Sequence, residues 1–154
     1  LAIDNGLVKL SDRVVMCAGI PLSSPLMANT IRVLVVGNII ARGTVFGYSD
    51  SAKQKVCGRV IHVQNFLELK ETLRLSHKTI LVCDRITEEM IPVLRIVDGV
   101  VSETGSDISE ENLRLVNKSL VYIQNVPDAV KILEDNLSIS IDGEQGLVYE
   151  GAIV

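Results

Sequence analysis

The residues from Ser102 to Val116, SETGSDISEENLRLV, combine the start of a helix with a group of acidic side chains. Asp107, Glu110 and Glu111 fall in the turn where the helix should begin. A helix start that follows a strand can hold an anion, because its unpaired backbone N–H groups and the positive end of the helix dipole point outward. Carboxylates repel a phosphate at such a place. The stretch is therefore either a phosphate site that has lost its chemistry or was never such a site.

The cysteines and histidines offer little further chemistry. Cys17, Cys57 and Cys83 each lie in an apolar run and form no C-x-x-C pair, so we expect buried thiols rather than a disulfide or a metal site. His62 lies in a strand-like run and His77 in a polar turn, and neither has the neighbouring ligands of a metal centre. We expect no metal site and no catalytic histidine.

Composition excludes several classes of function. With 154 residues and 47% hydrophobic content the chain can bury a core. No apolar run approaches the ~18–20 residues that cross a membrane, and no basic segment precedes an apolar one as in a signal peptide. A net charge of −4 and 3% aromatic residues argue against nucleic acid as a partner. We expect a cytoplasmic protein and, since the first residues begin in mid-pattern without methionine, a fragment of a longer one.

The chain divides into two parts by charge and pattern. Residues 1–43 carry a net charge of +2 and residues 44–154 one of −6, and the polar run VFGYSDSAKQK between them fits a linker. The first part has two β-rich runs that flank the irregular loop IPLSSPLMAN. In the second part strands alternate with helices, which predicts an α/β fold with parallel pairing at its centre. The expected strands are RVIHV, TILVC, VDGVVSE and LVYIQN, the expected helices begin near Asn65, Ile91-Pro92, Asp107 and Pro127, and SISIDGEQGLVYEG should form a closing hairpin.

This order of elements resembles the C-terminal region of pyruvate kinases. In that family a strand of the form D-x-V-V-x-x-A-G-x-P leads through a loop to T-N and a final apolar strand. The chain keeps Asp12, Val14, Val15, Ala18, Gly19, Pro21 and Asn29 of this pattern. Residues 59–154 resemble the mobile phosphohistidine domain of phosphoenolpyruvate-utilising enzymes, which some bacterial pyruvate kinases append. ILVCDRITEEMIPVLRIVDGVVSETGS and ISIDGEQGLVYEG carry that similarity.

The resemblance implies a division into domains and a fold for each. Residues 1–43 would be the tail of the pyruvate kinase C-terminal α/β domain, and residues 44–58 a linker and a first strand. Residues 59–154 would be a swivelling β/β/α phosphohistidine-like domain.

The working histidine of the mobile domain lies in a Gly-Gly-x-Thr-Ser-His segment. Without a gap, this segment falls on Gly105 to Glu110, so that Glu110 takes the place of the histidine and Ile108 that of the threonine. Phosphoryl transfer requires a nucleophilic imidazole there. We expect Glu110 to be structural instead, completing a D-x-x-E capping box with Asp107 as the N-cap. The resemblance therefore implies no catalytic residue, and an active phosphohistidine carrier is excluded by Glu110.

A second candidate site is the loop of the first part. In the family this loop contributes to the effector pocket of the C-terminal domain, so the resemblance implies effector-binding roles for Gly19, Ser23, Ser24 and Asn29. The loop has no glycine after Gly19 with which to bring backbone N–H groups against a phosphate.

The resemblance implies a non-catalytic C-terminal part of pyruvate kinase, the glycolytic enzyme that transfers phosphate from phosphoenolpyruvate to ADP, with a structural or regulatory role. The catalytic residues, Mg²⁺ and K⁺ would belong to the upstream catalytic domain, which is the expected partner. These residues alone should hold no cofactor and be inactive, and the family suggests a homotetramer. The alternative is a stand-alone protein-interaction module derived from the mobile domain, without phosphotransfer activity.

Overall fold

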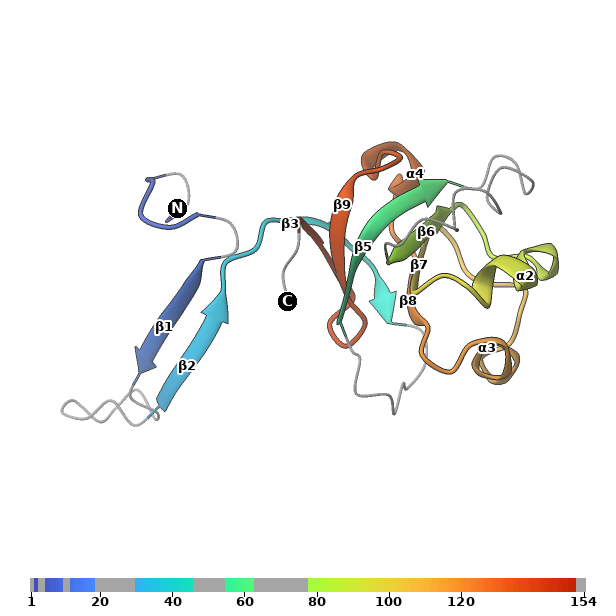
Figure 1. Ribbon diagram of the computed structural model, residues 1–154, viewed down its shortest axis with the longest axis horizontal. Helices are drawn as coiled ribbons and strands as arrows, with labels where there is room; N and C mark the ends of the chain where they lie inside the picture. Colours follow the sequence, from blue (N-terminus) through green and yellow to red (C-terminus); the bar gives the residue numbers. More distant parts are fainter. Residues whose placement is uncertain are drawn as a thin grey trace.

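The computed structural model describes residues 2, 5–9, 12–18, 30–45, 55–62 and 78–151. Their strands form a two-stranded hairpin and an eight-stranded sheet, which lie apart in Figure 1 with a single connecting segment between them. No helix in this described part is long and apolar enough to cross a membrane.

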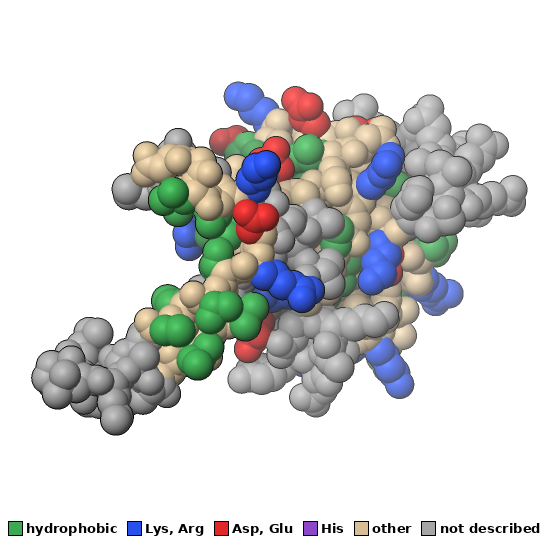
Figure 2. Space-filling view, turned by 60° about the vertical axis from the view of Figure 1, so that its left-hand side comes forward, with side chains coloured by type: hydrophobic (Ala, Val, Ile, Leu, Met, Phe, Trp, Pro, Cys, Tyr) green, Lys and Arg blue, Asp and Glu red, His purple; other side chains and the backbone are tan. Residues whose placement is uncertain are grey.

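The hairpin consists of β1 (Arg13–Ala18) and β2 (Thr30–Val35), which pair antiparallel as their β-branched residues favour. Val15 lies directly opposite Val33, so both side chains share one face of the hairpin with Ile31. These three side chains are 63–72% exposed, and Figure 2 shows hydrophobic side chains gathered over this arm of the molecule. An isolated two-stranded hairpin is marginal in water, and this one leaves an apolar face open.

The eight-stranded sheet has the parallel centre that the alternation of strands and helices predicts. Strands β5, β6, β7 and β8 pair parallel, and the remaining pairs are antiparallel. The order across the sheet is β3-β10-β9-β5-β6-β7-β8-β4. The strands are β3 (Ile39–Arg42), β4 (Thr44–Val45), β5 (Lys55–His62), β6 (Thr79–Cys83), β7 (Gly99–Ser102), β8 (Val121–Gln124), β9 (Ser138–Asp142) and β10 (Leu147–Glu150).

Short helices follow the parallel strands. A 3₁₀ turn, η1 (Glu88–Met90), leads into α2 (Ile91–Leu94), α3 follows β7 at Glu110–Val116, and α4 spans Ala129–Ile132 after β8. Pro92 lies in the first turn of α2, where its missing N–H has no helical partner to lose. The helix expected from Asn65 lies outside the described residues.

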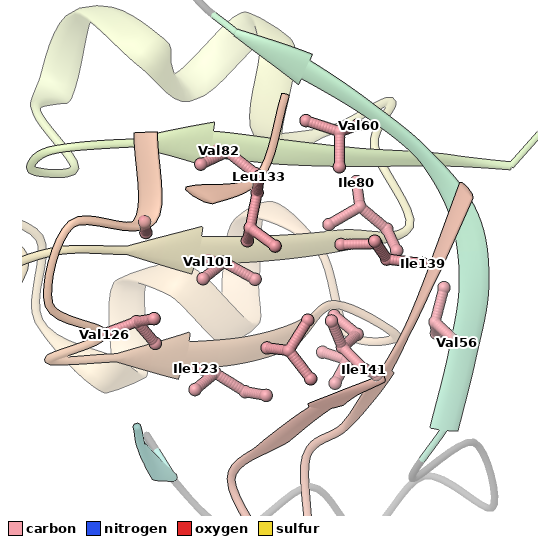
Figure 3. Close-up of a cluster of buried hydrophobic side chains, with 13 residues drawn as sticks. Val56, Val60, Ile80, Val82, Val101, Ile123, Val126, Leu133, Ile139 and Ile141 are labelled. Atoms are coloured by element: carbon pink, nitrogen blue, oxygen red, sulfur yellow. The ribbon is translucent and has the colours of Figure 1, made fainter. Parts of the chain in front are cut away.

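Buried side chains form two clusters, because successive residues of a strand point to opposite faces. In β6, Ile80 and Val82 belong to one cluster, while Leu81 and Cys83 belong to the other together with residues of α2 and α3. The first cluster also contains Ile139 and Ile141 of β9 and residues around α4, as Figure 3 shows. Burying an isoleucine or leucine side chain stabilises the fold by roughly 1.5–3 kcal/mol. The two clusters therefore stabilise the described sheet on both of its faces.

The closing hairpin of β9 and β10 turns at a buried acid. Asp142 is fully buried, and its Oδ1 accepts hydrogen bonds from the backbone N–H groups of Glu144 and Gln145 at 3.0 and 3.1 Å. Its Oδ2 forms an ion pair with Lys55 Nζ of β5 at 3.3 Å. A left-handed glycine, Gly146 with φ +67°, ends the turn. The D-G-x-x-G pattern thus builds the predicted hairpin, and its aspartate also ties the turn to β5.

A single residue, Gly43, closes the sheet on itself. Strands β3 and β4 lie at opposite ends of the strand order, yet only Gly43 separates them along the chain. The N–H of Gly43 donates to the carbonyl of Gly146 at 2.8 Å. A Cβ at Gly43 would lie 2.5 Å from both Gln124 O and Val126 Cγ2. Only glycine fits where the segment crosses from β10 to β8, so this position is specified by sterics.

Residues on both sides of the boundary expected at position 43 therefore enter one sheet. Strand β3 belongs to the expected tail of the first domain (1–43), while β4 and the start of β5 fall in the expected linker and first strand (44–58). The division of the chain into these domains stays a prediction, and the sheet pairing shows that residues 39–45 fold with the second part.

Replacing Gly43 by alanine should destabilise the protein by about 1–3 kcal/mol, because the added methyl group meets backbone and core atoms that cannot retreat. Gly105→Ala is the matched control, since its Cβ would lie 3.7 Å from Gln124 Oε1, which is an ordinary van der Waals contact. Urea unfolding of both variants measures the difference. Equal stabilities would show that the crossing at Gly43 is not tightly packed.

Candidate functional site

The candidate site lies at the carboxyl edge of the parallel strands, where the segments that follow β6 and β7 are hydrogen-bonded to each other. Strand β7 ends at Ser102, residues 103–109 form a loop, and α3 begins at Glu110. The position that the resemblance assigns to the phosphohistidine is thus the first residue of a helix after a strand, as expected from the sequence.

The carboxylate of Glu110 is engaged within its own helix. Its Oε1 accepts a hydrogen bond from Arg114 Nη2 at 2.7 Å, one helical turn further on. Both side chains are about half exposed, and such surface pairs contribute roughly 0.3–0.5 kcal/mol. Glu110 is therefore a charged residue of the helix surface, stabilised by a cation of the same helix.

The predicted capping box is wrong. The N-cap of α3 is Ser109, whose Oγ accepts from the N–H of Asn112 at 3.4 Å. Asp107 instead accepts from Arg85, with Oδ1 2.7 Å from Nε and 2.6 Å from Nη2. The hydrogen bond and the charge of Asp107 raise the pKa of the Arg85 guanidinium. Asp107 lies two residues before the N-cap, and Glu110 is the first residue of the helix rather than its third, so the D-x-x-E arrangement does not form.

Ile108, which the resemblance places at the threonine of the family segment, is part of the core. Ile108 is only 5% exposed and packs in the same cluster as Leu94 and Leu113. Ser106 Oγ bonds both the N–H and the carbonyl of Ile108, at 3.0 and 2.9 Å, and the N–H of Asp107 donates to Ile86 O at 2.9 Å. The loop is thus held by its own hydrogen bonds and by an apolar anchor where the family has a hydroxyl group.

Beneath this edge lie three buried groups that the sequence did not single out together. Ser102 Oγ and Tyr122 OH are hydrogen-bonded at 2.8 Å, and burial raises the pKa of Tyr122 to about 12. Burial, and then the charges of Asp84 and Glu103, raise the pKa of Cys83 to about 12. A thiol that stays protonated at neutral pH is a poor nucleophile, so this cluster serves packing rather than covalent chemistry.

The cysteine prediction holds only in part. Cys83 is buried as expected and Cys57 is partly buried, but Cys17 is exposed. The reason is that Cys17 lies on β1, opposite Ile31 and on the open face of the hairpin. An apolar run in sequence indicates a strand, and it does not say whether the face of that strand is covered.

Of the histidines and the effector-loop candidates, only His62 lies among the residues that the structure describes. His62 ends β5, where its N–H donates to Asp135 Oδ1 at 3.1 Å and its Nε2 contacts the carbonyl of Leu133, so it links β5 to the end of α4. His77 and the effector-loop candidates Gly19, Ser23, Ser24 and Asn29 lie outside the described residues. Among the residues that are described, no three acidic, cysteine or histidine side chains gather as metal ligands.

Sequence reasoning missed the pairing of Arg85 with Asp107 and the cap at Ser109. A signal for the cap was present, because a serine directly before a run of helix-forming residues is a strong N-cap. The Arg85 pair had no such signal, since its two members are 22 positions apart in the sequence and come together only through the parallel pairing of β6 and β7.

Known proteins resemble the chain both over one domain and over nearly its whole length. The family model described as "PEP-utilising enzyme, mobile domain" matches residues 75–146. The chain is 26% identical to "Pyruvate kinase" of Staphylococcus haemolyticus and 27% identical to that of Staphylococcus aureus strain USA300, in each case over 150 residues, or 97% of its length. The chain spans about a quarter of the length of these curated relatives, 24% in each case. The matches confirm the resemblance expected from the sequence, and the α/β sheet agrees with it.

The raised pKa values predict a loss of stability at alkaline pH. Tyr122 and Cys83 keep their protons in the folded state to about pH 12, against unfolded values of 10.0 and 9.0. The folded state therefore binds more protons in this window, and the free energy of unfolding should fall as pH rises from about 9 to 12, by on the order of 1 kcal/mol per pH unit for each group. The contribution is fully present below pH 9.

Urea unfolding at a series of pH values, under reducing conditions, tests this dependence. Tyr122→Phe keeps the ring but removes one titrating group, so its slope above about pH 10 should be shallower than that of the unsubstituted protein. Identical slopes in the two proteins would contradict the assignment of Tyr122.

Proposed function

Since the chain resembles the C-terminal region of pyruvate kinases, including the mobile domain of PEP-utilising enzymes, we propose that it is a non-catalytic part of a pyruvate kinase with a structural or regulatory role. By this proposal the catalytic residues, Mg²⁺ and K⁺ belong to an upstream catalytic domain, and the chain alone neither holds a cofactor nor turns over substrate. The proposed setting is a cytoplasmic homotetramer.

The observation that carries the proposal is the state of the phosphohistidine position. Glu110 stands there with its carboxylate bound to Arg114 at 2.7 Å, and Ile108 fills the core where the family has threonine. Glu111 adds negative charge beside it and would repel a phosphoryl dianion by on the order of 1 kcal/mol near the surface, while the charge of Asp107 is paired with that of Arg85. The sheet that presents the site is kept, while the groups that would accept phosphate are replaced.

The open face of the hairpin argues for a partner beyond these residues. Val15, Val33 and Ile31 form an apolar face that is open in the described structure. Hydrophobic faces of this kind mark contact surfaces, and the curated relatives are about four times as long as the chain. We propose that the upstream part of a pyruvate kinase covers this face. Effector binding through Gly19, Ser23, Ser24 and Asn29 belongs to the same proposal.

The native mass of the gene product in its source cells tests the proposal. An antibody against residues 78–151 should detect a band several times larger than 16.8 kDa, and the purified large protein should form ATP from phosphoenolpyruvate and ADP. A band near 17 kDa without that activity would favour the alternative, a stand-alone interaction module. Sustained ATP formation by the chain alone would contradict the non-catalytic role.

The loss of phosphocarrier chemistry makes a separate prediction. The native gene product, incubated with radiolabelled phosphoenolpyruvate without ADP, should acquire no acid-labile, base-stable label. Glu110→His should remain unlabelled as well, because Ile108 offers no hydroxyl donor to the phosphoryl group and Glu111 still repels it. Glu110→Gln is the control of similar size without an imidazole. Label on the histidine variant would show that one substitution accounts for the loss.

A further inference from the structure

We propose that Gly37 is a one-residue hinge, about which the eight-stranded sheet changes its orientation relative to the β1–β2 hairpin. The unit that moves then begins at Asn38, whereas the sequence predicts a linker at residues 44–58. This inference does not rest on the proposed function. It depends on the hydrogen bonds of the residues on either side of Gly37.

The residue before the hinge belongs to the hairpin. The N–H of Val36 donates to the carbonyl of Asp12 at 2.9 Å. This bond lies directly beyond the last pair of the ladder, Arg13 opposite Val35. The hairpin pairing therefore continues through Val36, and this residue moves with the hairpin.

The residue after the hinge belongs to the sheet. The N–H of Glu150 donates to the carbonyl of Asn38 at 2.9 Å, and Asn38 Nδ2 donates to Glu150 Oε2 at 3.1 Å. Strand β3 begins at the next residue and pairs with β10, with Ile39 opposite Tyr149. Asn38 is thus held to the sheet through both its backbone and its side chain.

Strand β3 is also held at its other end, where the chain crosses to β4. The N–H of Gly43 donates to the carbonyl of Gly146 at 2.8 Å, and β4 pairs with β8. Bending within β3 would break its pairing with β10 and disturb this close-packed crossing. Rotation at Gly37 breaks neither, so the hinge lies before β3 and not within it.

The structure as described joins the two parts through the chain alone. Among the described residues, the hairpin and the eight-stranded sheet share no strand pair. All members of the two buried clusters lie between Ile40 and Val148, and Figure 1 shows one segment, between β2 and β3, as the connection. A rotation at Gly37 therefore leaves the described strand pairs and both clusters intact.

Glycine suits this position because it adopts positive and negative φ with similar ease. A hinge needs only a few residues that absorb a large change in φ and ψ. The Cα atoms of Val36 and Asn38 can lie at most about 7 Å apart across such a residue. The hinge therefore changes the angle between the two parts and keeps their separation short, unlike a long flexible linker.

Residual dipolar couplings of the backbone amides of the 154-residue chain test the hinge. The couplings of the hairpin and of the sheet should require separate alignment tensors. The hairpin tensor should be at most about half as strong as that of the sheet, because glycine samples left-handed and right-handed torsions with similar ease. Amides of β5 and β8, which lie in one sheet, should share a tensor and are the internal control.

Two substitutions restrict the hinge to different degrees. Gly37→Pro should bring the ratio of the two tensor strengths toward one, because proline fixes its own φ at about −65° and restricts the residue before it. Gly37→Ala should change the ratio in the same direction by less, because alanine disfavours positive φ and keeps the N–H group. An unchanged ratio in a folded variant would place the motion at other residues and overturn the proposal.

Cross-strand nuclear Overhauser effects show whether both parts are folded. Val15 faces Val33 in the hairpin, and Val56 faces Ile141 in the sheet. Both effects should persist in the alanine variant, which decides the test if the proline variant loses either. One common tensor in the unmodified chain overturns the proposal. Absence of the hairpin effect from that chain also overturns it, because the hinge requires an ordered hairpin on its first side.

Discussion

The close approach of the backbone at Gly43 is the constraint on which the rest of the sheet depends. Without a side chain, this residue lets the chain pass between Gly146 and Gln124 and so places β3 and β4 at opposite ends of one sheet. An exposed sheet edge is a site for unwanted pairing, and the crossing covers both edges with adjacent pieces of the chain. The parallel centre, which positions the candidate site, is thereby held from both sides.

The carboxyl edge of that centre carries the candidate site, in which charged side chains are paired with one another. The loop between β7 and α3 is fixed by backbone hydrogen bonds to the end of β6 and to the segment that follows β6. Its polar groups now satisfy one another: Arg85 binds Asp107, and Arg114 binds Glu110. Such exposed pairs contribute little to stability. Their effect is chemical, because the cations that could attract a phosphate are paired with carboxylates.

Prediction from sequence succeeded where a local pattern decides the outcome. The uniformly apolar run TILVC became a strand buried along its whole length, and the D-G-x-x-G pattern became the turn of the closing hairpin. It failed for Asp107, since Asp107 and Ser109 are both plausible caps until the first helical residue is known. It also failed for Cys17, whose exposure depends on what covers the hairpin face.

The sequence by itself indicated most of the described strands and helices, the parallel centre and the family resemblance, and this resemblance implies that Glu110 stands where the family has its histidine. Each of these is written in residue types and their spacing. Only the tertiary structure decided that residues 39–45 close the eight-stranded sheet. It also decided that Asp107 pairs with Arg85 instead of capping α3. Both depend on residues that are distant along the chain, such as Gly43 and Gly146, and no periodicity in sequence specifies which distant strands will meet.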